Sequence, residues 1–299
     1  MIEEQARLDA AEAVKQARLD AAEAAKQARQ DSAKAAQNAR ILELASIRES
    51  WSLRTLLHGS RSELIAWGEN DEKQCDIPNR LMKVVEISGG SGHNLALKED
   101  GTVVAWGRNE WKQCDIPSGL KNVVGISAGI FSHSLAVRKD GTVVAWGYNK
   151  EKQCDVPTGL ADVVGISGGS AHSLALKKDD TVVAWGDNKW KQCDVPVGLT
   201  GVVGISGGGR HSLALKKDGT VVAWGENDEK QCDVPIGLTD VVGVYAGFCN
   251  SFAVRKDGAV GAWGRNEKKQ CDVPIGLTNV VAVSGGAGHT LALKKASSD

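Results

Sequence analysis

The sequence predicts a mainly β protein, a six-unit β-propeller preceded by a long N-terminal α-helix, and three observations support this fold. Composition changes sharply near residue 60, because all 35 Gly and all 6 Pro of the 299 residues lie at or beyond Gly59. The tripeptide AWG then recurs six times at a spacing of 39 or 40 residues. Within each copy, runs of β-branched residues alternate with turn residues, which is typical of short strands. We therefore expect a helical segment at 1–58, a linker at 59–63 and the propeller at 64–299.

The N-terminal segment repeats every eleven residues, at 5–15, 16–26 and 27–37, and consists largely of strong helix formers. Eleven residues over three turns favour a straight or weakly right-handed coil. The stripe is mostly Ala, which buries little area. Three interpretations stay open: a solvated single helix, a coiled coil or partner-binding helix that self-associates through residues 1–40, and an amphipathic membrane helix, which the acids on its polar face disfavour. Residues 41–58 carry an apolar face that should dock onto another surface, the following domain being the obvious one.

Each copy of the repeat is expected to form three or four short strands. VVAWG is followed by a QCD tripeptide, a proline, a VVGIS run, a GG or AG pair and an HSLAL run, with Trp at Trp67, Trp106, Trp146, Trp185, Trp224 and Trp263. HSLAL and the next VVAWG are joined at Asp-Gly, a favoured hairpin turn. In one copy the turn is Asp179-Asp180, so a residue other than glycine is expected there at a position that favours positive φ.

The two ends of the repeat region complement each other. The first repeat starts at 64–68, LIAWG, without an HSLAL run before it, and the last stops after 289–293, HTLAL, without a VVAWG run after it. Pairing these two segments would complete one sheet from both ends and remove the open edges. We therefore expect a closed ring; the alternative is that six repeats keep a wider curvature and leave a gap.

These residues resemble the chromosome-condensation-regulator repeat family, in a short-repeat form similar to β-lactamase inhibitory protein II. The resemblance covers about residues 64–295 and implies a propeller, usually of seven blades, that acts by binding proteins on its faces. The sequence departs from the family in having six repeats and in carrying Lys where the family has Gly before Gln, so a different turn is expected there. Its repeats are also too short for the inserted wedge of the branch that acts on small GTPases, so exchange activity is poorly supported.

Composition and charge exclude several classes of protein. The chain carries 36 basic and 37 acidic residues, a net charge of −1, which argues against a strongly basic nucleic-acid binder. It has no apolar run of about 18 residues, so no membrane span is expected. The first 30 residues carry acids throughout, so a secretory signal is not expected either. The odd number of cysteines, 7, fits a reducing, intracellular compartment, and we expect a cytoplasmic protein.

The repeated Cys and His residues have structural interpretations. Equivalent cysteines on neighbouring blades would lie too far apart for disulfides or a shared metal, so buried structural thiols are expected. The histidines His93, His133, His172, His211 and His289, with Asn250 in the remaining place, suggest one hydrogen bond per blade. No nucleophile–base or carboxylate pair stands apart from the repeat, so we expect no enzyme, no metal and no cofactor.

Positions that differ between repeats are better indicators of function than the repeat itself. Two places vary, the residues before the histidine and the turn after AWG, and they contain the candidate partner-binding residues Trp111, Trp190, Phe131, Arg210 and Phe248. The alternative is that these side chains pack against the N-terminal helix or a neighbouring blade. We expect a non-catalytic protein–protein interaction module, with a propeller face that binds a protein and a helix that tethers or multimerises it as a scaffold. The alternative is a regulator of an enzyme or small GTPase, as exchange factor or inhibitor.

Overall fold

The computed structural model describes residues 64, 66, 70–79, 81–286 and 288–294. The chain divides into two compact parts, Met1–Arg48 and Glu49–Asp299, and every described residue belongs to the second. The helix predicted at 1–58 and the linker at 59–63 lie outside the described residues. Within the described part the protein is mainly β, as predicted, and none of it forms a helix long and apolar enough to cross a membrane.

The strands belong to three series that recur along the chain. The inner strands are β1 (Val84–Gly89), β4 (Val123–Ala128), β7 (Val163–Gly168), β10 (Val202–Gly207), β13 (Val241–Ala246) and β16 (Val280–Gly285). The middle strands are β2 (His93–Lys98), β5 (His133–Arg138), β8 (His172–Lys177), β11 (His211–Lys216), β14 (Asn250–Arg255) and β17 (Thr290–Lys294). The outer strands are β3 (Val103–Gly107), β6 (Val143–Gly147), β9 (Val182–Gly186), β12 (Val221–Gly225) and β15 (Val260–Gly264).

Each set of consecutive strands forms an antiparallel sheet, numbered here sheet 1 (β1–β3) to sheet 6 (β16–β17) in chain order. In sheet 2 the register pairs His133 with Gly147 and Ser134 with Trp146, and the other three-stranded sheets repeat it. The inner strand begins with a bulge, between Val123 and Gly125 in sheet 2. The prediction of three or four short strands for each repeat is thus confirmed, with three strands in each of sheets 1 to 5.

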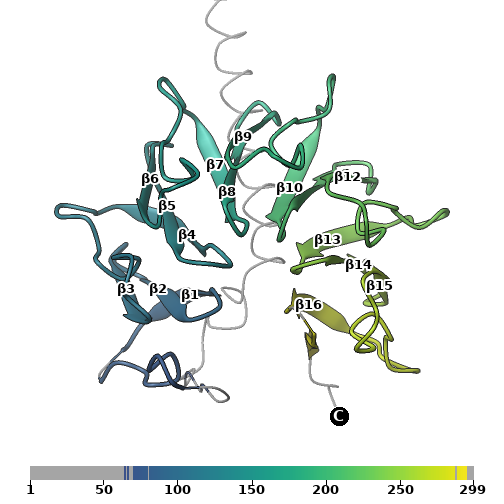
Figure 1. Ribbon diagram of the computed structural model, residues 1–299, viewed down its shortest axis with the longest axis horizontal. Coiled ribbons are helices and arrows are strands. Elements are labelled where there is room, and N and C mark those ends of the chain that lie inside the picture. Colours follow the sequence, from purple (N-terminus) through teal and green to yellow (C-terminus); the bar gives the residue numbers. More distant parts are fainter. Residues whose placement is uncertain (1–63, 65, 67–69, 80, 287, 295–299) are drawn as a thin grey trace, which may run out of the picture. The chain divides into compact units, whose positions relative to one another are not determined.

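The sheets succeed one another around a common centre, with the inner strands nearest to it, as in a β-propeller (Figure 1). Each inner strand contacts the inner strand of the next sheet, from β1 and β4 through to β13 and β16. A serine Oγ of one inner strand accepts a hydrogen bond from the backbone of the next; Ala128 N donates to Ser88 Oγ at 2.9 Å and Gly168 N to Ser127 Oγ at 3.0 Å. Successive sheets are therefore joined by polar contacts as well as by packing.

The predicted pairing of residues 64–68 with β17 involves segments that lie mostly outside the described residues. The exposure of β17 differs from that of the other middle strands. Leu291 of β17 is 56% exposed, whereas the equivalent Leu213 of β11 is 0% exposed. Among the described residues, one face of β17 is therefore left uncovered, whereas both faces of the other middle strands are covered.

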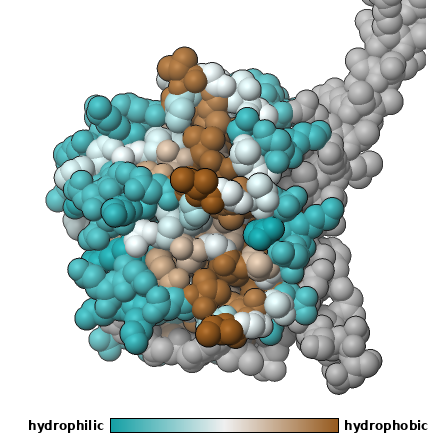
Figure 2. All heavy atoms as spheres, turned by 90° about the vertical axis from the view of Figure 1, so that its right-hand side faces the viewer, coloured by the Kyte–Doolittle hydropathy of each residue, from teal (hydrophilic) through white to brown (hydrophobic). Residues whose placement is uncertain are grey.

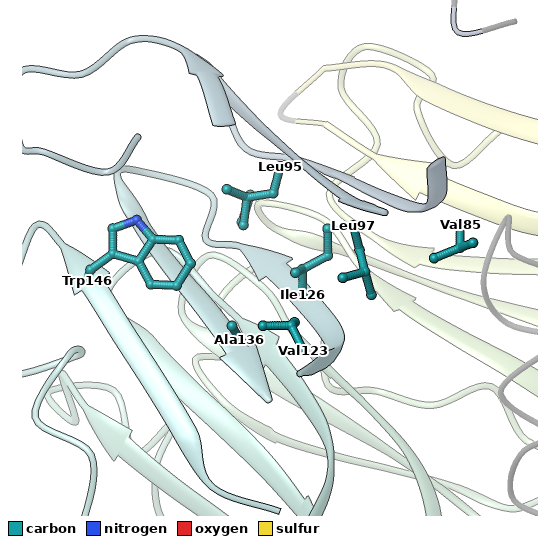
Figure 3. Packing of buried hydrophobic residues seen from close by; sticks show 8 residues of the cluster. Val85, Leu95, Leu97, Val123, Ile126, Ala136 and Trp146 are labelled. Atoms are coloured by element: carbon teal, nitrogen blue, oxygen red, sulfur yellow. The ribbon is translucent and has the colours of Figure 1, made fainter. Parts of the chain in front are cut away.

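The hydrophobic core lies between neighbouring sheets. Leu95 and Leu97 of β2 pack against Val123 and Ile126 of β4 and against Trp146 of β6 (Figure 3). Middle strands β5, β8, β11 and β14 are buried at every position except the last, because both of their faces meet another sheet. This explains why HSLAL reads as a continuous run of small and apolar residues.

Several turns hold residues other than glycine in the left-handed backbone region. Asp180 has φ of +65°, close to the +82° of Gly141 in the same turn of sheet 2, which confirms the expectation for this hairpin. A lysine precedes the Gln-Cys pair of every repeat, and its φ lies between +60° and +63° in each: Lys73, Lys112, Lys152, Lys191, Lys230 and Lys269. These lysines adopt the left-handed conformation that glycine adopts without strain.

Candidate functional site

The histidines connect each sheet to the next. His172 Nε2 lies 3.0 Å from Ser212 Oγ of the following sheet, and His93, His133 and His211 make the equivalent contact at 2.9 to 3.3 Å. Ser212 Oγ in turn donates to the backbone carbonyl of Gln192 at 2.9 Å. Because the serine proton is used in that bond, the histidine must donate from Nε2, which leaves Nδ1 unprotonated. The expected hydrogen bond per repeat is thus confirmed for four histidines.

These four histidines are buried and neutral. Burial lowers the pKa of His133 and His172 to about 3 and that of His93 and His211 to about 4, with further lowering of His133 by the neighbouring His172 and His93. Their Nδ1 atoms are buried without a hydrogen-bond partner. Asn250 holds the same place in sheet 5, and its Oδ1, like the Nδ1 atoms of the histidines, is buried without a partner. The histidines therefore stabilise the junctions between sheets and are not available as acid–base groups near neutral pH.

The cysteine of each repeat anchors a loop. Cys154 Sγ donates to the carbonyl of Tyr148 at 3.3 Å, and its backbone N–H donates to Asn149 Oδ1 at 2.8 Å. Burial raises the pKa of Cys154 to about 12, which disfavours the reactive thiolate. All seven cysteines are free and only partly buried, so the prediction of buried thiols in the repeats is wrong as to the degree of burial. Among the described residues, no group of His, Cys, Asp or Glu could hold a metal ion.

The loop that follows each outer strand and the loop that precedes each middle strand meet at the same end of the sheets. We name this end the histidine face; residues 108–113 and 129–132 are one loop of each kind. The two loops of a sheet are joined by the backbone: Tyr148 N donates to Ser132 O at 2.8 Å, and Glu226 N to Arg210 O at 2.9 Å. All five candidate residues belong to these loops. The structure groups them into three clusters.

Trp111 forms the first cluster. Its ring lies edge-on to that of Tyr148 with centroids 5.0 Å apart, and Lys150 Nζ lies 5.3 Å from its centroid. Trp111 is nevertheless 42% exposed. Its ring is therefore held in one orientation while a large part of it faces solvent.

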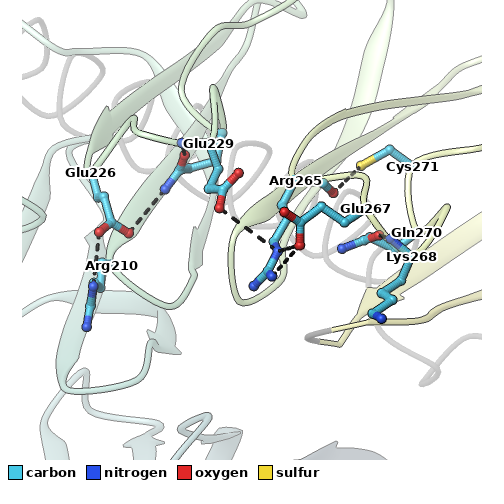
Figure 4. A network of polar contacts seen from close by, with 9 residues as sticks. Arg210, Glu226, Glu229, Arg265, Glu267, Lys268, Gln270 and Cys271 are labelled. Atoms are coloured by element: carbon cyan, nitrogen blue, oxygen red, sulfur yellow. Dashed lines mark hydrogen bonds and ion pairs between the residues drawn. The ribbon is translucent and has the colours of Figure 1, made fainter.

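Trp190 and Arg210 form the second cluster. The Arg210 guanidinium lies 4.9 Å from the Trp190 ring, and Arg210 Nη1 donates to Glu226 Oε1 at 3.0 Å. Glu226 is nearly buried and also accepts from Gln231 at 3.3 Å (Figure 4). This arrangement fixes a cation against an aromatic face, and Trp190 remains 39% exposed.

Phe131 and Phe248 form the third cluster, although they come from sheets 2 and 5. Their ring centroids are 6.2 Å apart with an interplanar angle of 54°. The two loops therefore meet near the common centre of the sheets. Phe131 is 48% exposed, and Phe248 is half-buried.

A second exposed apolar group was missed by the sequence reasoning. Val197, Ile236 and Ile275 occupy the same position of a Pro-X-Gly turn in three successive repeats, and each is 105 to 106% exposed. Figure 2, which faces the side where sheets 4 to 6 lie, shows apolar residues gathered in a band between hydrophilic surfaces. The signal was present in the sequence, because the same position holds polar residues in the other repeats: Asn79, Ser118 and Thr158.

Comparison with known proteins supports this architecture. A model of the regulator of chromosome condensation (RCC1) repeat matches residues 84–110, 123–153, 163–189 and 202–231. No curated protein sequence matches the chain at a significant level.

Solved structures resemble the chain at the level of the fold. Human WBSCR16 aligns with a TM-score of 0.60 and 20% identity, over 71% of this chain and 72% of that one. Prp20p from Saccharomyces cerevisiae aligns with a TM-score of 0.53 and 18% identity, over 74% of this chain and 84% of that one. The ectodomain of the Physcomitrella patens receptor kinase CR4 aligns with a TM-score of 0.57 and 26% identity, over 68% of this chain and 56% of that one.

Proposed function

We propose that this chain, four of whose repeats match the model of the RCC1 repeat, is a non-catalytic protein–protein interaction module whose histidine face binds a protein partner. The observation that carries the proposal is the set of three aromatic clusters on that face. Trp, Tyr and Arg dominate the binding energy of protein interfaces. Here Trp111, Trp190 and Phe131 are each 39 to 48% exposed, while neighbouring side chains hold them in place. Little side-chain freedom would be lost on binding, which favours affinity.

Ion pairs flank the aromatic clusters as the polar rim of an interface would. Arg265 Nε donates to Glu267 Oε2 at 3.1 Å and lies 3.9 Å from Glu229 Oε1 (Figure 4). Lys189 Nζ lies 3.3 Å from Glu151 Oε2. Such exposed pairs contribute little to stability, so their effect would be on orientation and on the rate of association.

The proposal is tested by affinity capture from the native cell, followed by binding measurements with the captured partner. Trp111→Ala combined with Trp190→Ala should weaken binding at least 100-fold, since each is an exposed anchor whose truncation typically costs about 2 kcal/mol. The control is Val197→Ser combined with Ile236→Ser, which removes exposed apolar side chains away from the histidine face. Undiminished binding by the tryptophan variant would refute the assignment of this face.

We also propose that the N-terminal segment tethers or multimerises the module and that the repeats close into a ring through residues 64–68. Light scattering on the full chain and on a chain without residues 1–40 tests the first idea, which predicts a larger assembly for the full chain. A disulfide engineered between residues 66 and 291, which face each other if the register of the other sheets is kept, tests the second, because it forms only if these segments are paired. A cytoplasmic location and the boundaries 1–58, 59–63 and 64–299 remain part of this proposal.

A second candidate is regulation of an enzyme or small GTPase. The structure of Prp20p is described together with its binding to Gsp1p and histones. At 18% identity this likeness extends only to the fold, so the candidate rests on a shared architecture. A nucleotide-release assay across small GTPases separates the two, because a pure interaction module would leave the release rate unchanged.

A further inference from the structure

An open surface pocket of about 450 Å³, called the cavity below, lies at the end of sheet 2 opposite the histidine face, and all of its lining residues except the half-buried Arg138 are exposed. Two segments of one repeat form it, the turn that leads into β4 and the hairpin between β5 and β6. The backbone joins them, since Lys139 N donates to Asn122 O at 2.8 Å. The lining residues are Gly119, Lys121, Asn122, Arg138, Lys139 and Asp140. None of them belongs to the proposed partner-binding face.

The hairpin of sheet 2 lacks an ion pair that its counterparts have. In the other complete sheets the last residue of the middle strand pairs with the hairpin aspartate, at distances of 3.0 to 4.0 Å: Lys98–Asp100, Lys177–Asp179, Lys216–Asp218 and Arg255–Asp257. Among the described residues, Arg138 forms no ion pair within 4.0 Å. The aspartate of its hairpin, Asp140, uses Oδ1 to accept from Thr142 N at 3.0 Å and Thr142 Oγ1 at 2.7 Å.

Arg138 is also left with an unsatisfied donor. Its Nε atom is buried without a hydrogen-bond partner. The Nε of Arg255 in sheet 5 shares this feature, but Arg255 Nη2 lies 4.0 Å from both Asp240 and Asp257. In sheet 2 the residue equivalent to Asp240 is Asn122, so the second carboxylate is missing. Arg138 therefore has one carboxylate near it, that of Asp140, whose pKa is lowered chiefly by Thr142 and in part by Arg138, and none at position 122.

The balance of charge around the cavity follows from the same comparison. Lys121, Arg138 and Lys139 face a single carboxylate, that of Asp140, which leaves two net positive charges. In sheet 5 the corresponding residues are Thr239, Arg255 and Lys256 with two carboxylates, and their charges cancel. Three cations around a cavity, without ion-pair partners among the described residues, form a site for an anion.

We propose that this cavity binds a phosphate group. A phosphate monoester carries about −1.5 to −2 charges near pH 7, which matches the net charge of the site better than one carboxylate does. The arginine fork would bind two phosphate oxygens, and the two lysines would supply point charges. The cavity is within the size range of small-molecule sites, so it has room for part of the group that carries the phosphate.

The test is isothermal titration of the full chain at low ionic strength with two probes, inorganic phosphate and a phosphoserine peptide, with the unphosphorylated peptide as reference. Asn122→Asp should weaken phosphate binding at least tenfold. The variant restores the acid found in sheets 3 and 5, where Asp162 and Asp240 hold the same left-handed backbone with φ of +56°. Arg138→Lys should weaken it as well, because a lysine at this place pairs with the hairpin aspartate in sheets 1, 3 and 4. Arg255→Lys is the matched control and should leave binding unchanged.

The two probes distinguish the source of the phosphate. Binding of inorganic phosphate that Asn122→Asp weakens supports the site for a free anion. Binding of the phosphopeptide alone, weakened by the same change, supports a phosphorylated partner. If neither probe binds with a Kd of about 1 mM or tighter, or if Asn122→Asp and Arg255→Lys have equal effects, the proposal is wrong.

Discussion

Lowering the pH from 7 to 5 should destabilise the protein strongly through its four buried histidines. The pKa of each is lowered from 6.5 to about 3 or 4 in the folded state because burial disfavours the imidazolium: His93, His133, His172 and His211. Between these values the unfolded chain binds more protons than the folded one, so stability rises with pH. The stabilisation is complete above pH 6.5 and is lost as the pH falls from 6.5 toward 4.

The size of the effect follows from the difference between the pKa values. One pKa unit corresponds to 1.36 kcal/mol, so at pH 5 each histidine lowers the free energy of unfolding by about 2 kcal/mol. Four histidines together give about 8 kcal/mol, which is comparable to the whole stability of a typical domain. The hairpin carboxylates of Asp100, Asp179 and Asp218 do not act in this range, because their pKa values, lowered to about 2 chiefly by hydrogen bonds from the following threonine, matter only below about pH 4.

Urea unfolding followed by tryptophan fluorescence measures this dependence, since Trp146, Trp185, Trp224 and Trp263 are each 7% exposed. The control is His172→Asn, which places at β8 the residue that begins β14. This variant should be less stable at pH 7. Between pH 7 and pH 5 its free energy of unfolding should fall by about a quarter less than that of the unchanged protein. A free energy of unfolding that changes by less than 1 kcal/mol between pH 7 and pH 5 would refute the reasoning.

Three further predictions concern single positions of the repeat, and urea unfolding measures each. Asp180→Gly should stabilise the protein by about 1 kcal/mol, because glycine adopts φ of +65° without the strain of a side chain; a loss of stability would contradict this. Gly169→Ala should destabilise it by about 3 kcal/mol, since the added Cβ would lie 2.2 Å from the ring of a buried histidine. Replacing Val197, Ile236 and Ile275 by Ser should leave stability unchanged within about 0.5 kcal/mol while shortening retention on a hydrophobic-interaction column, because these side chains contact almost nothing.

Local features of the fold could be predicted from the sequence. The Asp-Gly turns and the β-branched runs define the strands of each repeat without knowledge of their neighbours. The left-handed residue at Asp180 followed from comparing one hairpin with the others. The backbone of Lys152 and its equivalents could not be predicted, since lysine has no preference for positive φ and only the surrounding hydrogen bonds impose it, such as Lys152 N to Asn149 O at 3.2 Å.

The candidate site was predictable in its residues but not in its geometry. Variation between repeats identified Trp190 and Arg210, yet their contact depends on how two loops of successive repeats meet. Phe131 and Phe248 are 117 positions apart, and no local pattern indicates that their rings are close. For the same reason the sequence indicated a hydrogen bond for each histidine without showing that the acceptor is a serine of the next sheet.

The repeats separate the residues that stabilise the protein from those available for binding. The bonds that join sheets are made by residues present in nearly every copy: the histidine, the serine that follows it and the carbonyl of the glutamine. The exposed aromatic clusters, the aliphatic turns of sheets 4 to 6 and the basic cavity of sheet 2 occur only where copies differ. A change at such a position therefore alters a surface without breaking a junction between sheets. For this reason each binding proposal can be tested with a residue that another copy already carries at the same place, which makes loss of folding a poor explanation for loss of binding.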